Sequence, residues 1–333
     1  MRWIVAIVLS VSVATSLMAE ALYQSPYAKP KAKRVAVRPA PKLLAVGTTA
    51  VPKRQKVTKS TLPPSNSIVT ADTKAKTGVG MFALLDLRPS YLSNSGAWYQ
   101  ENWAELGVKF GADTKLSYVQ LFNNNLYDPT GRQSGPEFLL MDGFVRGRFA
   151  NLLDVPSSGF SISYEARAYL PTRESLRSIG MITSIRNYVM FKQKLSDNFS
   201  FNLWEVPIPH IFSQAGGQMI LPDGTQVETA APVFENRVYF VPELSLANGK
   251  VLFDFTLVHS AARYRDYKDS VKLNNDWGHI LWAYPEFTVE VSPGIALGVA
   301  YETESLISPD FSTFTIRDGL QKGAVRGVLQ LYF

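Results

Sequence analysis

The chain of 333 residues contains no cysteine and only three histidines. Without cysteine it has no disulfide framework, thiol nucleophile, thiolate metal site or lipid-modified cysteine. The histidines, His210, His259 and His279, do not have the spacing of metal ligands. Gly216-Gly217 lacks the following Lys-Ser/Thr pair that would hold a phosphate. The sequence therefore predicts neither a metal site nor a cofactor.

The chain also lacks a long apolar run after its first residues. Although 46% of its residues are hydrophobic, its mean hydropathy is only −0.02. A bundle of membrane helices is excluded, because each helix would need about 20 mostly apolar residues. A membrane β-barrel has this composition, since its apolar residues occupy alternate positions of many strands.

Residues 1–21 have the features of a secretory signal peptide. Arg2 supplies the positive start, residues 3–13 form a short apolar core, and Ala19-Glu20-Ala21 fits a cleavage site. A retained anchor helix is the alternative, although the apolar stretch is short for one that spans a bilayer. We expect the mature chain to enter the cell envelope.

Residues 22–78 form a basic segment that is rich in Lys and Pro. With Glu20 and Ala21 included, this part of the chain carries a net charge of +10, whereas residues 79–333 carry −5. The segment has no apolar period of two or 3.6 residues, so we expect it to be disordered in the periplasm. Its lysines would contact the cell wall or acidic lipid headgroups, or the segment is a solvated spacer. Nucleic-acid binding is not expected of a secreted chain.

From residue 79 onward the sequence predicts strand after strand. Between 159 and 170, for example, Phe160, Ile162 and Tyr164 alternate with Ser161 and Ser163. Twelve such runs are expected, at about 79–91, 97–110, 114–123, 137–149, 159–170, 176–194, 199–212, 231–246, 250–264, 277–291, 295–306 and 313–333. The predicted fold of residues 79–333 is an all-β, antiparallel up-and-down transmembrane barrel of about twelve strands.

The connections between the runs support a barrel. Short turns such as Ser196-Asp197-Asn198 follow even-numbered runs, and longer links such as 124–136 and 213–230 follow odd-numbered ones. The link 151–158 is expected to be the longest of the short set. We expect bulges at Pro242 and Pro285, because each proline removes a ladder donor. A soluble β-sandwich is the alternative fold.

The last residues of the chain alternate as a membrane strand does. Leu329, Leu331 and Phe333 fall on one face of an extended strand, and Arg326 and Gln330 fall on the other. This ending resembles the carboxy-terminal insertion signal of bacterial outer-membrane β-barrel proteins, whose last strand ends in Phe. The resemblance implies the cell outer membrane as location. It implies the barrel-assembly machinery, outer-membrane lipid and lipopolysaccharide as partners.

Strand parity predicts which charged side chains point into the barrel. The basic ones are Arg146, Arg148, Arg167 and Arg186, and the acidic ones are Glu235, Glu243, Asp254, Glu286, Glu290 and Glu302. Glu165 and Arg237 also point inward and break this segregation of charge. We expect a basic wall to face a largely acidic one, with a transverse field that orients dipolar solutes. The preferred function is a narrow passive channel for small polar or zwitterionic solutes.

Two further functions stay open at this stage. Twelve strands give a backbone diameter of about 24 Å, so long charged side chains from opposite walls would leave little free space. The charges would then pair and close the lumen, which leaves a structural barrel or a surface-binding one that serves in adhesion or as a receptor.

A lipid hydrolase of the outer membrane is the enzymatic alternative. His259 and Ser260 adjoin, but neighbours on a strand point to opposite faces, so His259 would need a serine from another strand. We therefore predict no enzyme and no catalytic residue.

Overall fold

The computed structural model describes residues 78–93, 95–127, 137–220, 226–265 and 277–333. The predicted signal peptide and the basic segment up to residue 77 lie outside these ranges.

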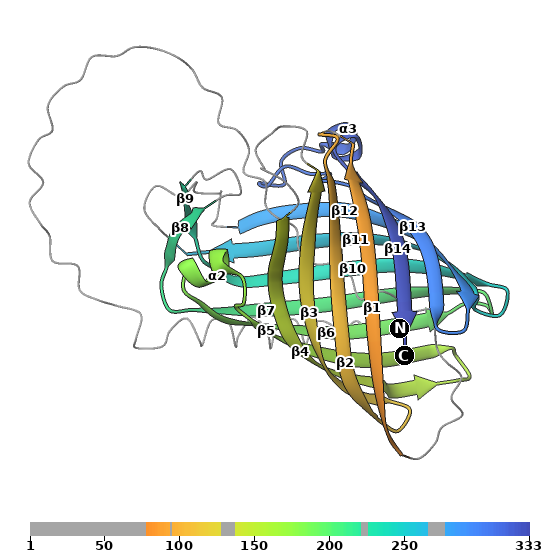
Figure 1. Cartoon of the computed structure of the whole chain (residues 1–333). Coiled ribbons are helices and arrows are strands. Elements are labelled where there is room, and N and C mark those ends of the chain that lie inside the picture. Colours follow the sequence, from red (N-terminus) through yellow and green to blue (C-terminus); the bar gives the residue numbers. More distant parts are fainter. Residues whose placement is uncertain (1–77, 94, 128–136, 221–225, 266–276) are drawn as a thin grey trace, which may run out of the picture. The chain divides into compact units, whose positions relative to one another are not determined.

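Twelve strands of the described chain form a closed antiparallel barrel (Figure 1). Consecutive strands are neighbours, and β1 pairs with β14 to close the ring, with Leu87 opposite Leu329. The barrel strands are β1 (Val79–Leu92), β2 (Trp98–Phe110), β3 (Thr114–Tyr127), β4 (Glu137–Val155), β5 (Phe160–Leu170), β6 (Met181–Lys194), β7 (Phe199–Phe212), β10 (Pro232–Leu246), β11 (Val251–Tyr264), β12 (Trp277–Ser292), β13 (Ile295–Glu302) and β14 (Ala324–Tyr332). This confirms the predicted fold and rules out a sandwich, because closure leaves no sheet edge.

Three segments differ from the predicted strands at one end of the barrel, the end that carries the longer connections and is called the loop-rich end below. Two predicted strands begin later than expected, because α2 (Glu174–Ser178) precedes β6 and α3 (Ile316–Gln321) precedes β14. Gly180 follows α2 with a φ of +78°, a conformation that ends a helix and suits glycine. The predicted loop 213–230 contains a separate hairpin, β8 (Gly216–Ile220) and β9 (Gln226–Ala230).

The irregularities of the strands also differ from expectation. The connection predicted at 151–158 is not longer than the other short turns, because strand β4 continues to Val155. It does so through a register shift between Phe149 and Leu153, with Asn151 at a φ of +57°. No register shift occurs at Pro242 or Pro285, where the ladders continue in the same register. A proline removes one backbone N–H donor from the ladder, and this loss alone does not require the extra residue of a β-bulge.

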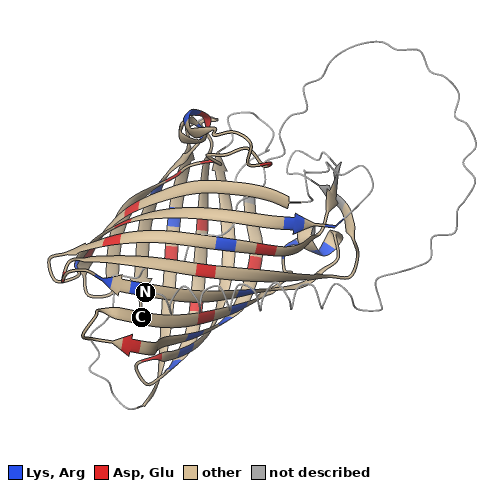
Figure 2. Cartoon of the chain, turned by 180° about the vertical axis from the view of Figure 1, so that it is seen from behind, with Lys and Arg blue, Asp and Glu red and all other residues tan. Residues whose placement is uncertain are grey.

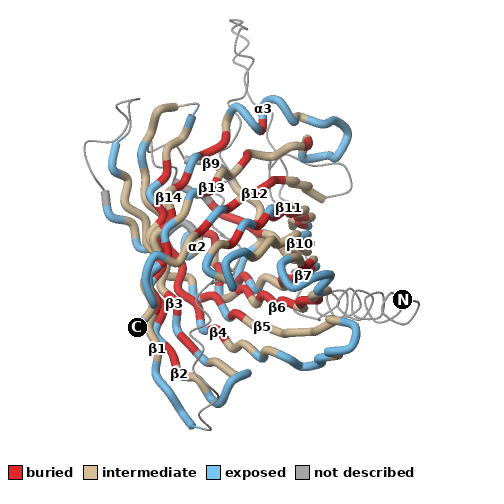
Figure 3. Tube along the Cα trace, turned by 90° about the vertical axis from the view of Figure 1, so that its right-hand side faces the viewer, coloured by how far each residue is buried: buried red, intermediate tan, exposed pale blue. Residues whose placement is uncertain are grey.

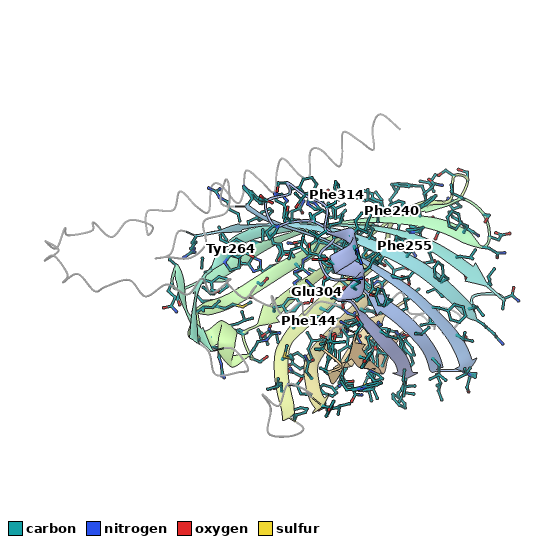
Figure 4. All side chains as sticks on the ribbon, turned by 90° about the horizontal axis from the view of Figure 1, so that it is seen from above. Phe144, Phe240, Phe255, Tyr264, Glu304 and Phe314 are labelled. Carbon is teal, nitrogen blue, oxygen red and sulfur yellow. The ribbon has the colours of Figure 1, made fainter. Side chains whose placement is uncertain are left out.

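The two faces of the sheet differ sharply in exposure. Figure 3 shows buried residues along the middle of the strands and exposed ones at the turns and loops. Along β14, Arg326 and Gln330 are buried inside the barrel, whereas Leu329, Leu331 and Phe333 have the opposite parity. Large apolar side chains such as Phe240 and Phe255 (Figure 4) are exposed on the outer face.

Exposed aromatic residues mark both ends of the outer face. Trp98, Tyr127 and Phe138 lie near the loop-rich end of β2, β3 and β4, and Phe110 and Phe149 lie near the end with the short turns. Such girdles occupy the two interfaces of a bilayer. Among the described residues, no helix is long and apolar enough to cross a membrane.

Replacing Val145 by arginine tests whether the apolar outer face lies in the bilayer. Val145 is 42% exposed at the middle of β4, so Val145→Arg should destabilise the barrel by about 2–4 kcal/mol in lipid. Phe110→Arg, at the end of β2 beside the Gly111 turn, should cost only about 0–1 kcal/mol. Urea unfolding in lipid vesicles measures both. Equal costs would contradict a bilayer centred on the middle of the strands.

Candidate functional site: the charged interior of the barrel

The ten charged residues predicted to point inward all occupy the inner parity of their strands. Arg146, Arg167, Arg186, Asp254 and Glu286 are buried. The half-buried ones are Arg148, Glu235, Glu243, Glu290 and Glu302. Their role in solute passage stays a prediction.

The strand register arranges the arginines in a row. Arg146 on β4 is directly opposite Arg167 on β5, and Arg167 is directly opposite Arg186 on β6. Like charges directly opposite each other destabilise a sheet. Acidic groups or ligands must therefore offset this arginine row.

A matching acidic row crosses three other strands. Glu243 on β10 is opposite Asp254 on β11, which is opposite Glu286 on β12. Charged positions recur on neighbouring strands around the barrel wall (Figure 2). In the ring, β7 lies between β6 and β10, so it separates the two rows on that side.

Counter-ions from nearby strands neutralise most of both rows. In the arginine row, Arg146 forms an ion pair with Glu105 of β2, and the Nε atom of Arg167 donates to Glu165 at 2.6 Å. In the acidic row, Lys192 Nζ lies 3.0 Å from Glu243 Oε1, and Arg88 Nη1 lies 2.7 Å from Glu286 Oε2.

One member of each row has no ionic partner among the described residues. Arg186 forms no ion pair there, and the Asp254 carboxylate accepts a hydrogen bond only from the Thr256 hydroxyl, at 3.2 Å. Each row thus keeps one position without an ionic partner in this part of the chain.

Sequence reasoning missed Asp86, Arg88 and Glu101 as charged residues of the interior. Arg88 and Asp86 on β1 pair at 2.9 Å, and Arg326 on β14 pairs with Glu101 and Glu302. The same parity rule applied to 79–92 and 98–110 would have placed Arg88 and Glu101 inside. Asp86 lies only two residues from Arg88, but Glu286 lies 198 residues from Arg88 and Arg326 lies 225 residues from Glu101, so no local signal gave these two pairs.

The middle of the barrel is filled by aromatic and charged side chains. The Arg167 guanidinium lies 4.4 Å from the Tyr188 ring centre and 5.1 Å from that of Phe144, which Figure 4 labels. Arg88 and Arg167 are each only 1% exposed, and Tyr239 is fully buried. The interior is therefore closely packed at this level.

The segment around α2 adds to the interior at the loop-rich end. Ile179 belongs to the same buried cluster as Trp103, Phe144 and Tyr169. Arg173, just before α2, lies 3.6 Å from the Asp142 carboxylate. Burial lowers the pKa of Arg173 and the Arg186 charge lowers it further, whereas Asp142 opposes this shift.

The structure separates His259 and His279 from Ser260. Ser260 donates to Glu235 at 2.6 Å inside the barrel. His259 has the outward parity, and its Nε2 atom lies 3.3 Å from Nδ1 of His279. His259 and Ser260 thus point to opposite faces, as the strand geometry predicted.

Loss of the Arg88 guanidinium tests the buried ion pairs. Arg88→Met should destabilise the barrel by about 3–5 kcal/mol, because Asp86 and Glu286 would stay buried without a cation. Lys194→Met breaks an exposed pair with Asp197 and should cost less than about 1 kcal/mol. Urea unfolding of both variants measures the difference. Similar small costs would mean that the interior pairs are hydrated.

No protein-family model and no curated protein matches the chain. Among solved structures, the NanC porin aligns with 74% of this chain and 98% of its own at 12% identity, with a TM-score of 0.44. An outer membrane channel from Pseudomonas putida F1 aligns with 79% of this chain and 98% of its own at 8% identity, with a TM-score of 0.49. Likenesses at this level carry no argument about function. The closed strand order and the apolar outer face themselves define a membrane-spanning β-barrel.

Proposed function

We propose that the protein is a narrow passive channel of the outer membrane for small polar or zwitterionic solutes. The observation that carries the proposal is the pair of oppositely charged rows on the inner wall, at Arg146, Arg167 and Arg186 and at Glu243, Asp254 and Glu286. A barrel that serves only as a membrane anchor has no need of buried charge, which is costly to desolvate.

The rows suggest how a solute passes. Opposite charges on two sides of a low-dielectric interior make a field that orients a dipolar solute. The members without an ionic partner among the described residues, Arg186 and Asp254, offer a guanidinium for an anionic group of the solute and a carboxyl for hydrogen bonds to a polar group. Passage is diffusion in which solute groups replace protein partners, and we propose no covalent step and no cofactor.

The packed middle of the barrel sets the size limit. Side chains that are 1% exposed, such as Arg88 and Arg167, must shift before a solute passes. The channel is therefore narrow and conducts through rearrangement of its ion pairs. Only small solutes would fit.

The remaining parts of the chain complete this proposal. Residues 1–21 serve as the signal peptide, and the barrel of residues 79–333 inserts through the assembly machinery by its last strand, β14, and the terminal Phe333. The basic segment 22–78 lies in the periplasm and contacts the cell wall. Lipid and lipopolysaccharide surround the apolar outer face.

A closed barrel is the second candidate function. The observation that favours it is the same close packing at Arg88, Arg167 and Tyr239. In a closed barrel the ion pairs would hold the wall together, and the loops would carry a structural or surface-binding role.

Bilayer conductance of the full chain separates the two candidates. We expect discrete openings, and Arg148→Glu should shift the ion selectivity toward cations, because Arg148 is half-buried on the inner face. The control is Arg317→Glu, which makes the same charge change on the exposed helix α3 and should leave the selectivity unchanged. A silent bilayer with a correctly folded barrel would contradict the channel and favour the closed barrel.

A further inference from the structure

Arg186 is unusual within the arginine row because it forms no ion pair with a described residue. Arg146 and Arg167 each have a glutamate in contact, whereas Arg186 has no acidic partner in the part of the chain that the structure describes. Its Nε and Nη1 atoms have no hydrogen-bond partner, although the residue is only 9% exposed. A buried guanidinium without an acceptor loses hydration without replacing it, so it calls for an anion.

The surroundings of Arg186 supply further donors. Its guanidinium lies 4.0 Å from the centre of the Tyr169 ring, which holds its plane in place. The buried Ser184 hydroxyl, two positions along the same face of β6, also has no partner. Arg173 has an unpartnered Nε atom, and its charge interacts with that of Arg186.

The local balance of charge points the same way. The described ion pairs match Arg146 with Glu105, Arg167 with Glu165 and Arg173 with Asp142. Arg186 is the member of this group that is left without an ion pair among the described residues.

We propose that Arg186, aided by the positive charge of Arg173, binds the carboxylate of a small organic anion or zwitterion near the loop-rich end of the interior. This inference rests on the proposed channel and names the solute group that it recognises. A carboxylate fits because it is small and planar, and its two oxygens match the fork of a guanidinium. The packed interior leaves little room for a larger anionic group.

Anion-dependent stability of the full-length barrel tests the site without relying on conduction. Thermal unfolding in detergent is followed with increasing sodium acetate, against sodium chloride at equal ionic strength. A ligand that binds the folded state raises the unfolding temperature by mass action, so the concentration dependence gives an apparent Kd. We expect acetate to stabilise the wild-type barrel more than chloride does.

The variants of Arg186 show whether the effect comes from this site. Arg186→Gln should weaken the apparent Kd for acetate about tenfold or more, and Arg186→Lys should lie in between, because it keeps the charge but loses the fork. The matched control is Arg177→Gln, which removes an exposed arginine from the adjacent α2 and should leave the Kd unchanged. If Arg186→Gln does not fold, Arg173→Gln should weaken acetate binding instead.

Three results would overturn the proposal. The first is that acetate stabilises the wild type no more than chloride does, and the second is that acetate stabilises the wild type and the Arg186 variants equally. The third is that sulfate stabilises the barrel and acetate does not. A silent bilayer together with acetate binding that depends on Arg186 would overturn the channel and leave the site standing. Open channels together with acetate binding that Arg186→Gln does not change would overturn the site and leave the channel standing.

Discussion

Charge buried inside a closed sheet is the constraint on which the interior of this protein depends. A membrane barrel must pair every strand with two neighbours, because unsatisfied backbone groups are too costly in lipid. Closure by β1 and β14 then sends alternate side chains into a space with little water. Every arginine or glutamate at those positions must find a partner there or hold a ligand.

The observed ion pairs follow from this constraint. Arg146 reaches Glu105 two strands away, past β3, and Lys192 reaches Glu243 past β7. Long side chains on a strongly curved wall can span one intervening strand, which a flat sheet would not allow so readily. Curvature therefore relieves the repulsion within the two rows of like charge.

The same packing connects stability with function. Arg167 between Phe144 and Tyr188 combines a buried ion pair with aromatic contacts, so the residues that hold the wall together also occupy the lumen. A solute that passes must compete for partners that stabilise the fold. Arg186 and Asp254, without an ionic partner among the described residues, are the positions where such competition costs least, since no described ion pair is broken there.

The sequence by itself determined an up-and-down barrel of about twelve strands and the face that most side chains occupy, because a period of two residues is a local property of the chain. Leu329 and Phe333 lie outside and Arg326 inside, as the alternation predicted. Local pattern was insufficient where a helical segment interrupts the alternation, as at α2 and α3.

Only the tertiary structure decided which charges meet. Arg88 and Glu286 are 198 residues apart, and their contact depends on ring closure and on the stagger of several strands. The alignment of Arg146, Arg167 and Arg186 depends on the register of two hairpins, which a shift such as that between Phe149 and Leu153 can alter. Register and closure are collective properties of many strand pairs, so no single segment of sequence contains them.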